Sequence, residues 1–289
     1  MNTIIPNPIN RYIRPMEQEK FIDISRLIKS KNPKLLKWLP RFVLSYLKRI
    51  LHQKEINTFL QKNKNKKNLE FSDEVMNYFN IKVSVSGIDQ IPKTGPVILV
   101  MNHPLGGMDG IAIISGIMRH RPDLKFIVND LLMNVENLKD LFIGVNKHGK
   151  NNVSVRSQLK NAFGEDHAIC IFPAGLVSRK INGTIQDLEW KKTFVTYARE
   201  LDRIVIPIYI DGRLSPFFYN LHRFRKFFGI KANIEMLYLS NELFKQRDQT
   251  IGFHVGQPIE GKKFHMELNE YKAAQEYKKR VYAIKDKIS

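Results

Sequence analysis

The sequence predicts an α/β fold with a mixed, largely parallel central sheet flanked by helices, preceded by an N-terminal basic amphipathic helical segment. From about residue 71 onward, short β-rich runs alternate with helix-like segments, which is the pattern of strands joined by crossover helices. Several of these runs are apolar throughout, as expected of strands that are buried on both faces of a sheet. The chain has 289 residues, 43% of them hydrophobic, and this is enough for one sizeable core.

Residues 1–70 are predicted to form an N-terminal helical segment with the features of a membrane-associating one. Between Lys34 and Leu51, apolar residues recur at helical spacing with Lys and Arg between them, which indicates one basic amphipathic helix. Such a helix could lie in a lipid interface, with Trp38 and Phe42 among the headgroups, or it could dock on its own domain. The pattern is compatible with both arrangements.

A Lys/Asn-rich run from Gln61 to Asn68 is predicted to be a solvated loop, although a nucleic-acid patch would have a similar composition. The second domain is expected to cover residues 71–289. Strands are predicted in "IKVSVSG", "PVILVMN", "KFIVN", "AICIFP", "IVIPIYI" and "EMLYLS". Helices are predicted over residues 110–118, 153–163 and 190–201.

The net charge of +19 predicts an anionic partner: nucleic acid, an anionic membrane or an acidic carrier protein. A single cysteine, Cys170, argues against a disulfide framework and a Cys-rich zinc site. The polar, Pro-rich N-terminus lacks the apolar core of a secretory signal, so we expect a cytoplasmic location. No uncharged apolar stretch reaches the ~18 residues of a membrane-spanning helix, so membrane contact should be peripheral.

The segment "PVILVMNHPLGGMDG" contains the strongest candidate for a catalytic pair. His103 directly follows a buried-looking strand, at the edge where open α/β sheets place their sites, and its pKa suits a general base. Asp109 could orient the imidazole and stabilise its charge, because Gly106 and Gly107 let the backbone turn sharply between the two. Alternatively, Asp109 caps the following helix and His103 is an ordinary polar residue.

A second candidate site lies in "IFPAGLVSRK", where a strand breaks at Pro173 and Gly175 and is followed by Ser178 and Arg179. The guanidinium of Arg179 suits a phosphate or carboxylate, although a surface Arg in a turn is the commoner case in so basic a protein. No GxSxG elbow, Walker loop, GxGxxG fingerprint or HExxH zinc helix is present. A nucleotide cofactor and a metal are therefore not expected.

Together the two segments resemble the glycerolipid acyltransferase superfamily, and in particular its hemolysin-labelled bacterial branch, over about Val83 to Ile259. That family has a His, four residues and an Asp, then Phe-Pro-Glu-Gly, then a strand containing Pro. Here five residues separate His103 from Asp109, "FPAG" spans Phe172 to Gly175 with Ala174 in place of Glu, and "VIPIYI" surrounds Pro207. With "FPAG" followed by "SR", then "DLEWKKTF" and later "FFYNLHRFRK", the chain resembles this branch, some of whose members acylate lyso-aminolipids.

The resemblance implies transfer of an acyl group from acyl-ACP or acyl-CoA to the hydroxyl of a lyso-lipid, either a lyso-aminolipid or lysophosphatidic acid. It implies His103 and Asp109 as the catalytic pair. It also implies that the acceptor binds to Lys147, Phe172, Pro173, Gly175, Ser178 and Arg179. We expect the enzyme on the inner face of the cytoplasmic membrane, with an anionic membrane surface, the lyso-lipid and an acyl carrier protein as partners and without a nucleic-acid partner.

Two rival interpretations come from other functional classes. A non-catalytic lipid-binding or membrane-active protein would depend on the helix at 34–51 and would tolerate the loss of His103. A nucleic-acid-binding protein would use the interleaved basic and aromatic residues of "FFYNLHRFRKFFGIK", although no recognised binding module is present.

Overall fold

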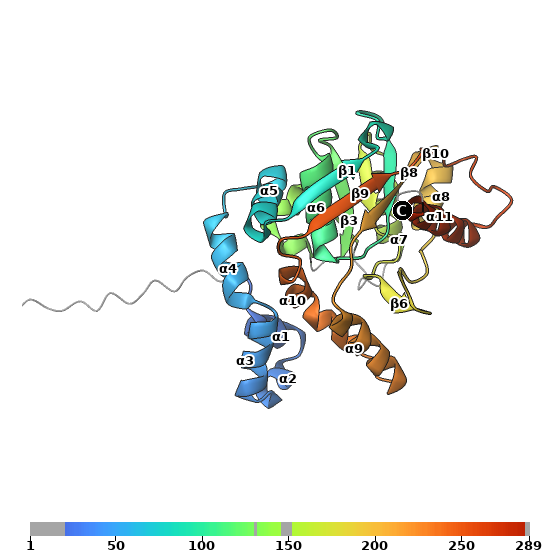
Figure 1. The fold of residues 1–289 in the computed structure, drawn as a ribbon. Coiled ribbons are helices and arrows are strands. Elements are labelled where there is room, and N and C mark those ends of the chain that lie inside the picture. Colours follow the sequence, from blue (N-terminus) through green and yellow to red (C-terminus); the bar gives the residue numbers. More distant parts are fainter. Residues whose placement is uncertain (1–20, 130–131, 146–151, 287–289) are drawn as a thin grey trace, which may run out of the picture. The chain divides into compact units, whose positions relative to one another are not determined.

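A computed structural model describes residues 21–129, 132–145 and 152–286 (Figure 1). The chain divides into two compact units, one with residues up to Arg49 and Gln53–Lys62, the other with Ile50–His52 and Asn63 onward. The domain boundary expected between residues 70 and 71 stays a prediction, and in the structure helix α5 (Asn68–Phe79) spans both positions. No helix among the described residues is long and apolar enough to cross a membrane.

The first unit consists of short helices: α1 (Ile24–Lys31), α2 (Pro33–Trp38), α3 (Arg41–Ile50, which extends into the second unit by one residue) and α4 (Gln53–Lys62). Asp23 caps α1 by accepting from the backbone N–H groups of Ser25 and Arg26. The Asn57 side chain joins α4 to the start of α1, since it accepts from the N–H of Ile22 at 2.8 Å and donates to its carbonyl at 2.7 Å. Local capping and these cross-links hold the unit together.

The single amphipathic helix predicted over residues 34–51 is wrong, because α2 and α3 are separate helices. Pro40 lies between them and has no N–H to continue the hydrogen-bond ladder of α2. Its carbonyl instead accepts from Val43 and Leu44 and starts α3. Trp38 and Phe42 are both exposed.

The second unit contains an eight-stranded sheet in the order β1-β9-β8-β2-β5-β3-β4, with β10 paired to β8. Its strands are β1 (Lys82–Ser86), β2 (Val97–Met101), β3 (Leu124–Asn129), β4 (Phe142–Val145), β5 (Ala168–Ile171), β8 (Ile204–Asp211), β9 (Thr250–Val255) and β10 (Ile259–Glu260). Strands β8, β2, β5, β3 and β4 are parallel, whereas β9 runs antiparallel to β8. The predicted fold class is confirmed.

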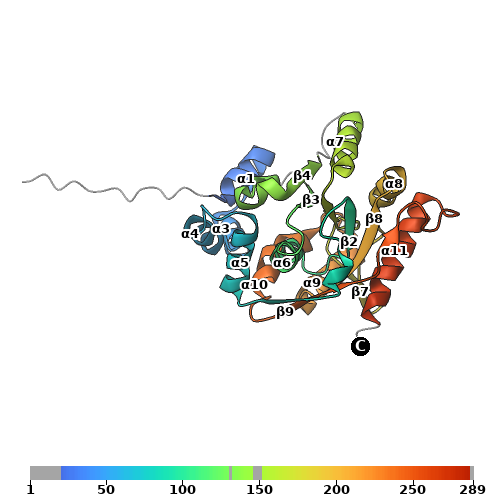
Figure 2. The same ribbon diagram turned by 90° about the horizontal axis from the view of Figure 1, so that it is seen from above.

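Helices cover both faces of this sheet. They are α6 (Gly107–Ile117), α7 (Asn152–Gly164), α8 (Thr193–Glu200), α9 (Pro216–Phe227), α10 (Leu239–Phe244) and α11 (Glu270–Lys285), with short 3-10 turns η1 (Ile88–Gln90), η2 (Leu132–Asn134), η3 (Glu136–Leu141) and η4 (Ile234–Tyr238). Figure 2 shows α5 and α6 on one side of the sheet and α8 and α11 on the other. On the α8 and α11 side, Trp190, Phe194 and Tyr277 pack on the alternating apolar residues of the strands.

Several elements of the C-terminal half differ from the predicted ones. "EMLYLS" forms η4 and the start of α10 rather than a strand, because its Glu235 is drawn into a buried ion network described below. Strand β9 and the hairpin of β6 (Arg179–Ile181) and β7 (Thr184–Gln186) were not predicted. The hairpin turns at Asn182 and Gly183, both at positive φ, and Asn-Gly is the sequence that favours such a turn.

Candidate active site

His103 lies at the carboxyl edge of the parallel strands, immediately after β2 and Asn102. The Asn102 side chain bridges to β8, since it donates to the carbonyl of Ile210 at 2.9 Å and accepts from its N–H at 2.7 Å. Because both of these backbone groups belong to a central strand, the end of β2 is held rigidly. The local sequence thus delivers His103 to a fixed place at the sheet edge, as open α/β folds do with their functional residues.

The structure brings His103 and Asp109 together. Nδ1 of the imidazole is 2.8 Å from Oδ2 of Asp109, which lies in the first turn of α6 and is fully buried. The same oxygen accepts from the N–H of Leu105 at 2.9 Å. Gly106 has a φ of 70° and provides the sharp turn that six positions of regular helix could not. The proposed roles of the pair in catalysis stay predictions.

The Nδ1–Oδ2 distance suits a hydrogen bond that the imidazole donates to the carboxylate. Burial raises the pKa of the Asp109 carboxyl above its ordinary value, while the hydrogen bond with His103 lowers it. The N-terminal end of α6 also favours negative charge on the carboxylate. When Nδ1–H donates to Asp109, Nε2 is the nitrogen that is free to accept a proton. The imidazole is 18% exposed and can therefore be reached from solution.

Phe172 supports the other side of the imidazole. It follows β5, the neighbour of β2, and its ring stacks on that of His103 with centroids 4.3 Å apart and planes 25° from parallel. The chain then turns at Gly175, which has a φ of 65° and donates its N–H to the Phe172 carbonyl. Pro173 accepts from the N–H of Lys191 at 3.1 Å. The segment "FPAG" thus forms a tight turn against the candidate base.

Ser178 and Asp187 hold the backbone of His103. The N–H of Ser178 donates to the His103 carbonyl at 2.8 Å, and its hydroxyl donates to Oδ1 of Asp187 at 2.6 Å. The same carboxylate oxygen accepts from the N–H of His103 at 3.2 Å, and Oδ2 accepts from Nε1 of Trp190 at 2.9 Å. Both Ser178 and Asp187 are buried, so this arrangement points to positioning of His103.

Asp187 was missed by the sequence analysis. Two signals for it were present: the Asn-Gly turn, which returns the chain toward Ser178, and the spacing of Asp187 three residues before Trp190. Neither signal identifies the partner of the carboxylate. That partner is a backbone N–H 84 positions away, and only the folding of the chain brings the two groups into contact.

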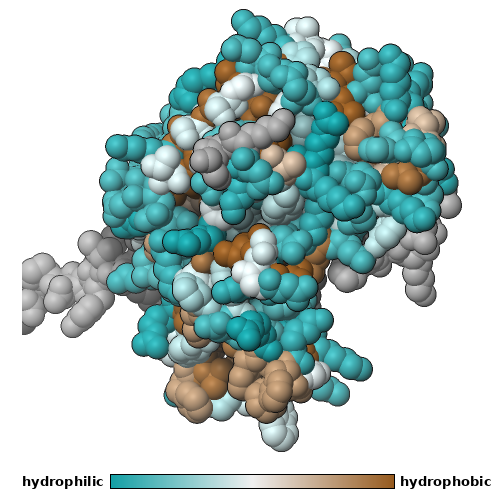
Figure 3. Space-filling view, turned by 45° about the vertical axis from the view of Figure 1, so that its right-hand side comes forward, coloured by the Kyte–Doolittle hydropathy of each residue, from teal (hydrophilic) through white to brown (hydrophobic). Residues whose placement is uncertain are grey.

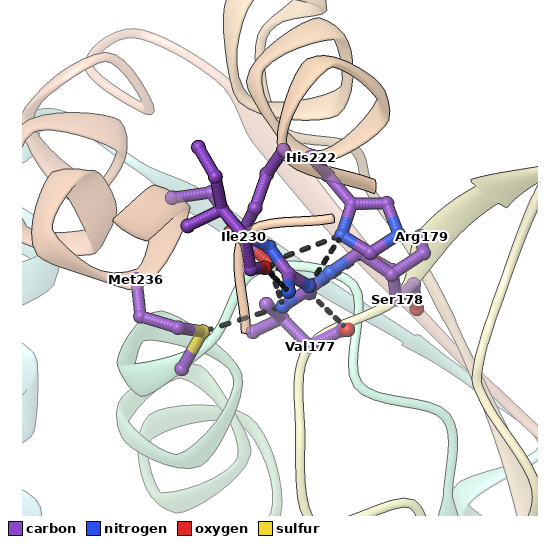
Figure 4. A network of polar contacts seen from close by, with 8 residues as sticks. Val177, Ser178, Arg179, His222, Ile230 and Met236 are labelled. Atoms are coloured by element: carbon purple, nitrogen blue, oxygen red, sulfur yellow. Dashed lines mark hydrogen bonds and ion pairs between the residues drawn. The ribbon is translucent and has the colours of Figure 1, made fainter. Parts of the chain in front are cut away.

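The side chain of Arg179 lies in a buried network of hydrogen bonds and ion pairs (Figure 4). Its side chain is 1% exposed, its Nη2 donates to Oε1 of Glu235 at 3.2 Å, and its Nη1 donates to the Val177 carbonyl at 2.5 Å. Arg225 and His222 of α9 approach the same carboxylate at 2.9 and 3.1 Å. The guanidinium of Arg179 is thus occupied by groups of the protein, and contact with an acceptor headgroup stays a prediction. Lys147 lies outside the described residues.

A cavity of about 640 Å³ lies at the same sheet edge, and the residues on either side of His103 in the sequence, Asn102 and Pro104, line it. It is lined by Asn102, Pro104, Leu105, Ser178, Gly183, Thr184, Ile185, Tyr209, Asp211, Gly212, Arg213, Gln246, Gln249, Thr250, Ile251, Tyr282 and Lys285. Its size is typical of small-molecule sites, and its lining mixes apolar and polar side chains. Among the described residues, no group of three or more His, Cys, Asp or Glu side chains could hold a metal ion.

Comparison with known proteins gives one concordant result. A family model described as Acyltransferase matches residues 26–289. Two curated proteins named lyso-glycine lipid O-acyltransferase, from Bacteroides thetaiotaomicron and Phocaeicola vulgatus, are each 43% identical over 264 residues. These alignments cover 91% of this chain and 97% and 95% of the two relatives.

Among solved structures, the chain is similar to a 1-acyl-sn-glycerophosphate acyltransferase, PlsC, from Thermotoga maritima. The TM-score is 0.49 and the sequence identity 19%, and the match covers 92% of this chain and 93% of the other.

Proposed function

The chain belongs to the acyltransferase family, and from this premise we propose that it transfers a fatty acyl group from acyl-ACP or acyl-CoA to the hydroxyl of a lyso-lipid at the membrane surface. The acceptor that we propose is a lyso-glycine lipid, because two relatives that align over nearly their whole length have that name. Membership of an enzyme family argues against the non-catalytic, membrane-active alternative.

The observation that carries the mechanism is the hydrogen bond between Nδ1 of His103 and the buried carboxylate of Asp109. It leaves Nε2 to remove the proton from the acceptor hydroxyl, while Asp109 stabilises the imidazolium that forms. The acceptor oxygen attacks the thioester carbonyl and forms a tetrahedral oxyanion. Collapse of that intermediate breaks the C–S bond, and the imidazolium returns its proton to the departing thiolate.

Positioning is the second part of this mechanism. Phe172 stacks on one face of the imidazole. The Asp187 carboxylate accepts from the His103 N–H, and the Ser178 N–H donates to the His103 carbonyl. Fixing a base within hydrogen-bond reach of its substrate converts a bimolecular proton transfer into a local one. Backbone N–H groups in the Gly-containing turns are proposed to stabilise the oxyanion.

The acceptor headgroup is proposed to enter the 640 Å³ cavity. Arg213 lines this cavity and is exposed, so its guanidinium could bind the carboxylate of a glycine headgroup. Arg179 is proposed to support the site through its buried network rather than to reach the headgroup. Arg213→Gln should raise KM for a lyso-glycine acceptor and change kcat less.

Location and partners follow from charge. The net charge of +19 favours anionic lipid and an acidic acyl carrier protein, which supports our proposal that the enzyme acts at the inner face of the cytoplasmic membrane. In this proposal a carrier delivers the thioester, and the protein supplies acid–base chemistry at His103 and backbone N–H groups for the oxyanion.

The test is acyl transfer from labelled acyl-ACP and acyl-CoA to a panel that contains lyso-glycine lipid, lyso-ornithine lipid and lysophosphatidic acid. His103→Ala should lower kcat by about 10²–10⁴-fold, the usual contribution of a general base. His265→Ala is the matched control, since His265 is paired with Glu267 at 2.7 Å but is exposed. Full activity in a folded His103→Ala variant would refute the mechanism, and no product from wild type with any acceptor would refute the function.

A further inference from the structure

Helix α9 and the residues that follow it expose an unusual amount of aromatic surface. Phe224, Phe227 and Phe228 are 54%, 84% and 59% exposed. Their rings contact one another, with centroids 4.5 Å apart for Phe224 and Phe228 and 5.1 Å apart for Phe227 and Phe228. Figure 3 shows hydrophobic side chains that reach the surface among hydrophilic ones. Three adjacent exposed phenylalanines form a contiguous patch, which usually marks an interaction site.

The same segment is strongly cationic. Arg223 and Lys226 of α9 line an open pocket of about 760 Å³ together with the three phenylalanines, and Lys180 of the β6–β7 hairpin lines its other side. Lys231 follows four residues after α9. The sequence from Pro216 to Lys231 contains no Asp or Glu. We call Arg223, Phe224, Lys226, Phe227, Phe228 and Lys231 the α9 surface.

The opposite face of α9 is firmly anchored in the second unit. Phe218 is fully buried, with the guanidinium of Arg179 over its ring at 5.0 Å. Arg225 and His222 both approach the carboxylate of Glu235 in η4. The two faces of this helix thus differ: buried charged residues anchor one face, and the other exposes a cluster of apolar rings.

This anchorage also connects the α9 surface to the active site. Arg179, which is paired with Glu235, is the residue after Ser178, and the N–H of Ser178 holds the carbonyl of His103. An ion pair, a peptide bond and a hydrogen bond therefore link the network under α9 to the His103 backbone, all within the second unit. The α9 surface and the candidate active site therefore belong to the same compact unit.

We propose that the α9 surface docks on an anionic lipid bilayer and thereby presents the active site to acceptors in that bilayer. The proposal rests on the proposed function, since a lyso-lipid acceptor is found in membranes. Phenylalanines at the end of a helix enter the boundary between headgroups and acyl chains, while neighbouring Lys and Arg pair with anionic headgroups. Phenylalanines that pack on one another favour lipid over nucleic acid, for which separate rings along a basic groove are typical.

The test is sedimentation of the full chain with phosphatidylcholine vesicles that contain 0 or about 30% phosphatidylglycerol, a fraction chosen for a clear surface charge. The double variant Phe227→Ser, Phe228→Ser should bind the anionic vesicles at least about tenfold more weakly than wild type, because two rings no longer enter the bilayer. Arg223→Gln with Lys226→Gln should remove most of the preference for anionic vesicles. Met266→Ser with Tyr271→Ser, two other exposed residues of the same unit, is the matched control and should bind as wild type does.

Vesicle binding requires no acyl transfer, so the proposal can fail or succeed independently of the proposed function. A second measurement uses the reaction itself: Phe227→Ser, Phe228→Ser should slow transfer to an acceptor in vesicles by about the same factor and leave transfer to a short-chain, monomeric acceptor unchanged. Three results would overturn the proposal: wild-type vesicle binding by this variant, an equal loss in the Met266 and Tyr271 control, or tighter binding of wild type to duplex DNA than to anionic vesicles.

Discussion

Replacing Asp187 by Asn changes one atom of a buried side chain that holds three hydrogen-bond donors around His103. Oδ1 accepts from the His103 N–H and the Ser178 hydroxyl, and Oδ2 accepts from Nε1 of Trp190. An asparagine whose amide oxygen occupies the position of Oδ1 can keep the two bonds from the His103 N–H and the Ser178 hydroxyl. Its NH₂ group then faces the Trp190 N–H, which is a donor opposite a donor in a site without solvent.

The cost of this substitution can be worked out from those contacts. A buried donor without a partner costs about 1–3 kcal/mol, and hydrogen bonds to a neutral oxygen are about half as strong as those to a carboxylate. We therefore expect the free energy of unfolding to fall by about 2–4 kcal/mol. A shift of the His103 backbone would also misplace the imidazole, and a displacement of about 1 Å lowers rates by about 10²-fold.

The assay combines urea unfolding with kcat and KM for acyl transfer. For Asp187→Asn we expect lower stability and a kcat reduced by about 10–100-fold, with KM changed much less, because Asp187 acts through His103. Asp248→Asn is the control, since that exposed carboxylate accepts only from the Asn80 side chain and an amide can replace it. If Asp187→Asn has the stability and kcat of wild type, the positioning role assigned to Asp187 is refuted.

Three further predictions concern the second unit. Burial lowers the pKa of His222 below its ordinary value of 6.5, so this side chain takes up a proton at a higher pH in the unfolded chain than in the folded protein. The melting temperature should therefore fall as pH drops from 7 to 5, and it should fall less steeply in His222→Asn. Glu235→Gln leaves two buried arginines without a countercharge and should lower the free energy of unfolding in urea by about 3–5 kcal/mol. This loss is far larger than that expected from breaking an exposed ion pair. Gly116→Ala should destabilise by about 1–3 kcal/mol because its Cβ would lie 2.8 Å from Val83, whereas Gly110→Ala in the same helix has open space and should stabilise by about 0.5–1 kcal/mol in the same denaturation assay.

Much of the candidate active site could be anticipated from local patterns. The runs that form β2, β5 and β8 are apolar throughout because helices cover both of their faces. The sequence of each strand alone therefore indicates its burial. The approach of Asp109 to His103 depends on a turn of six residues, and glycine supplies the one conformation that such a turn needs. These features depend on neighbours along the chain.

The separation of α2 from α3 at Pro40 was also a local matter, although the hydrophobic periodicity concealed it. The short apolar run "EMLYLS" was different, since periodicity cannot decide between strand and helix over six residues. There the pairing of Glu235 with Arg179, 56 positions earlier, competes with strand pairing and leaves the segment helical.

By itself, the sequence determined the fold class and pointed to the sheet edge at His103 and to Asp109 as its candidate partner, because apolar runs, Gly-containing turns and residue spacing act over short stretches of chain. Only the tertiary structure decided what Asp187 and Arg179 do. One carboxylate holds the backbone of His103 and one guanidinium is buried against Glu235, since the energy of a charge depends on which groups surround it after packing, and sequence neighbours do not reveal those groups.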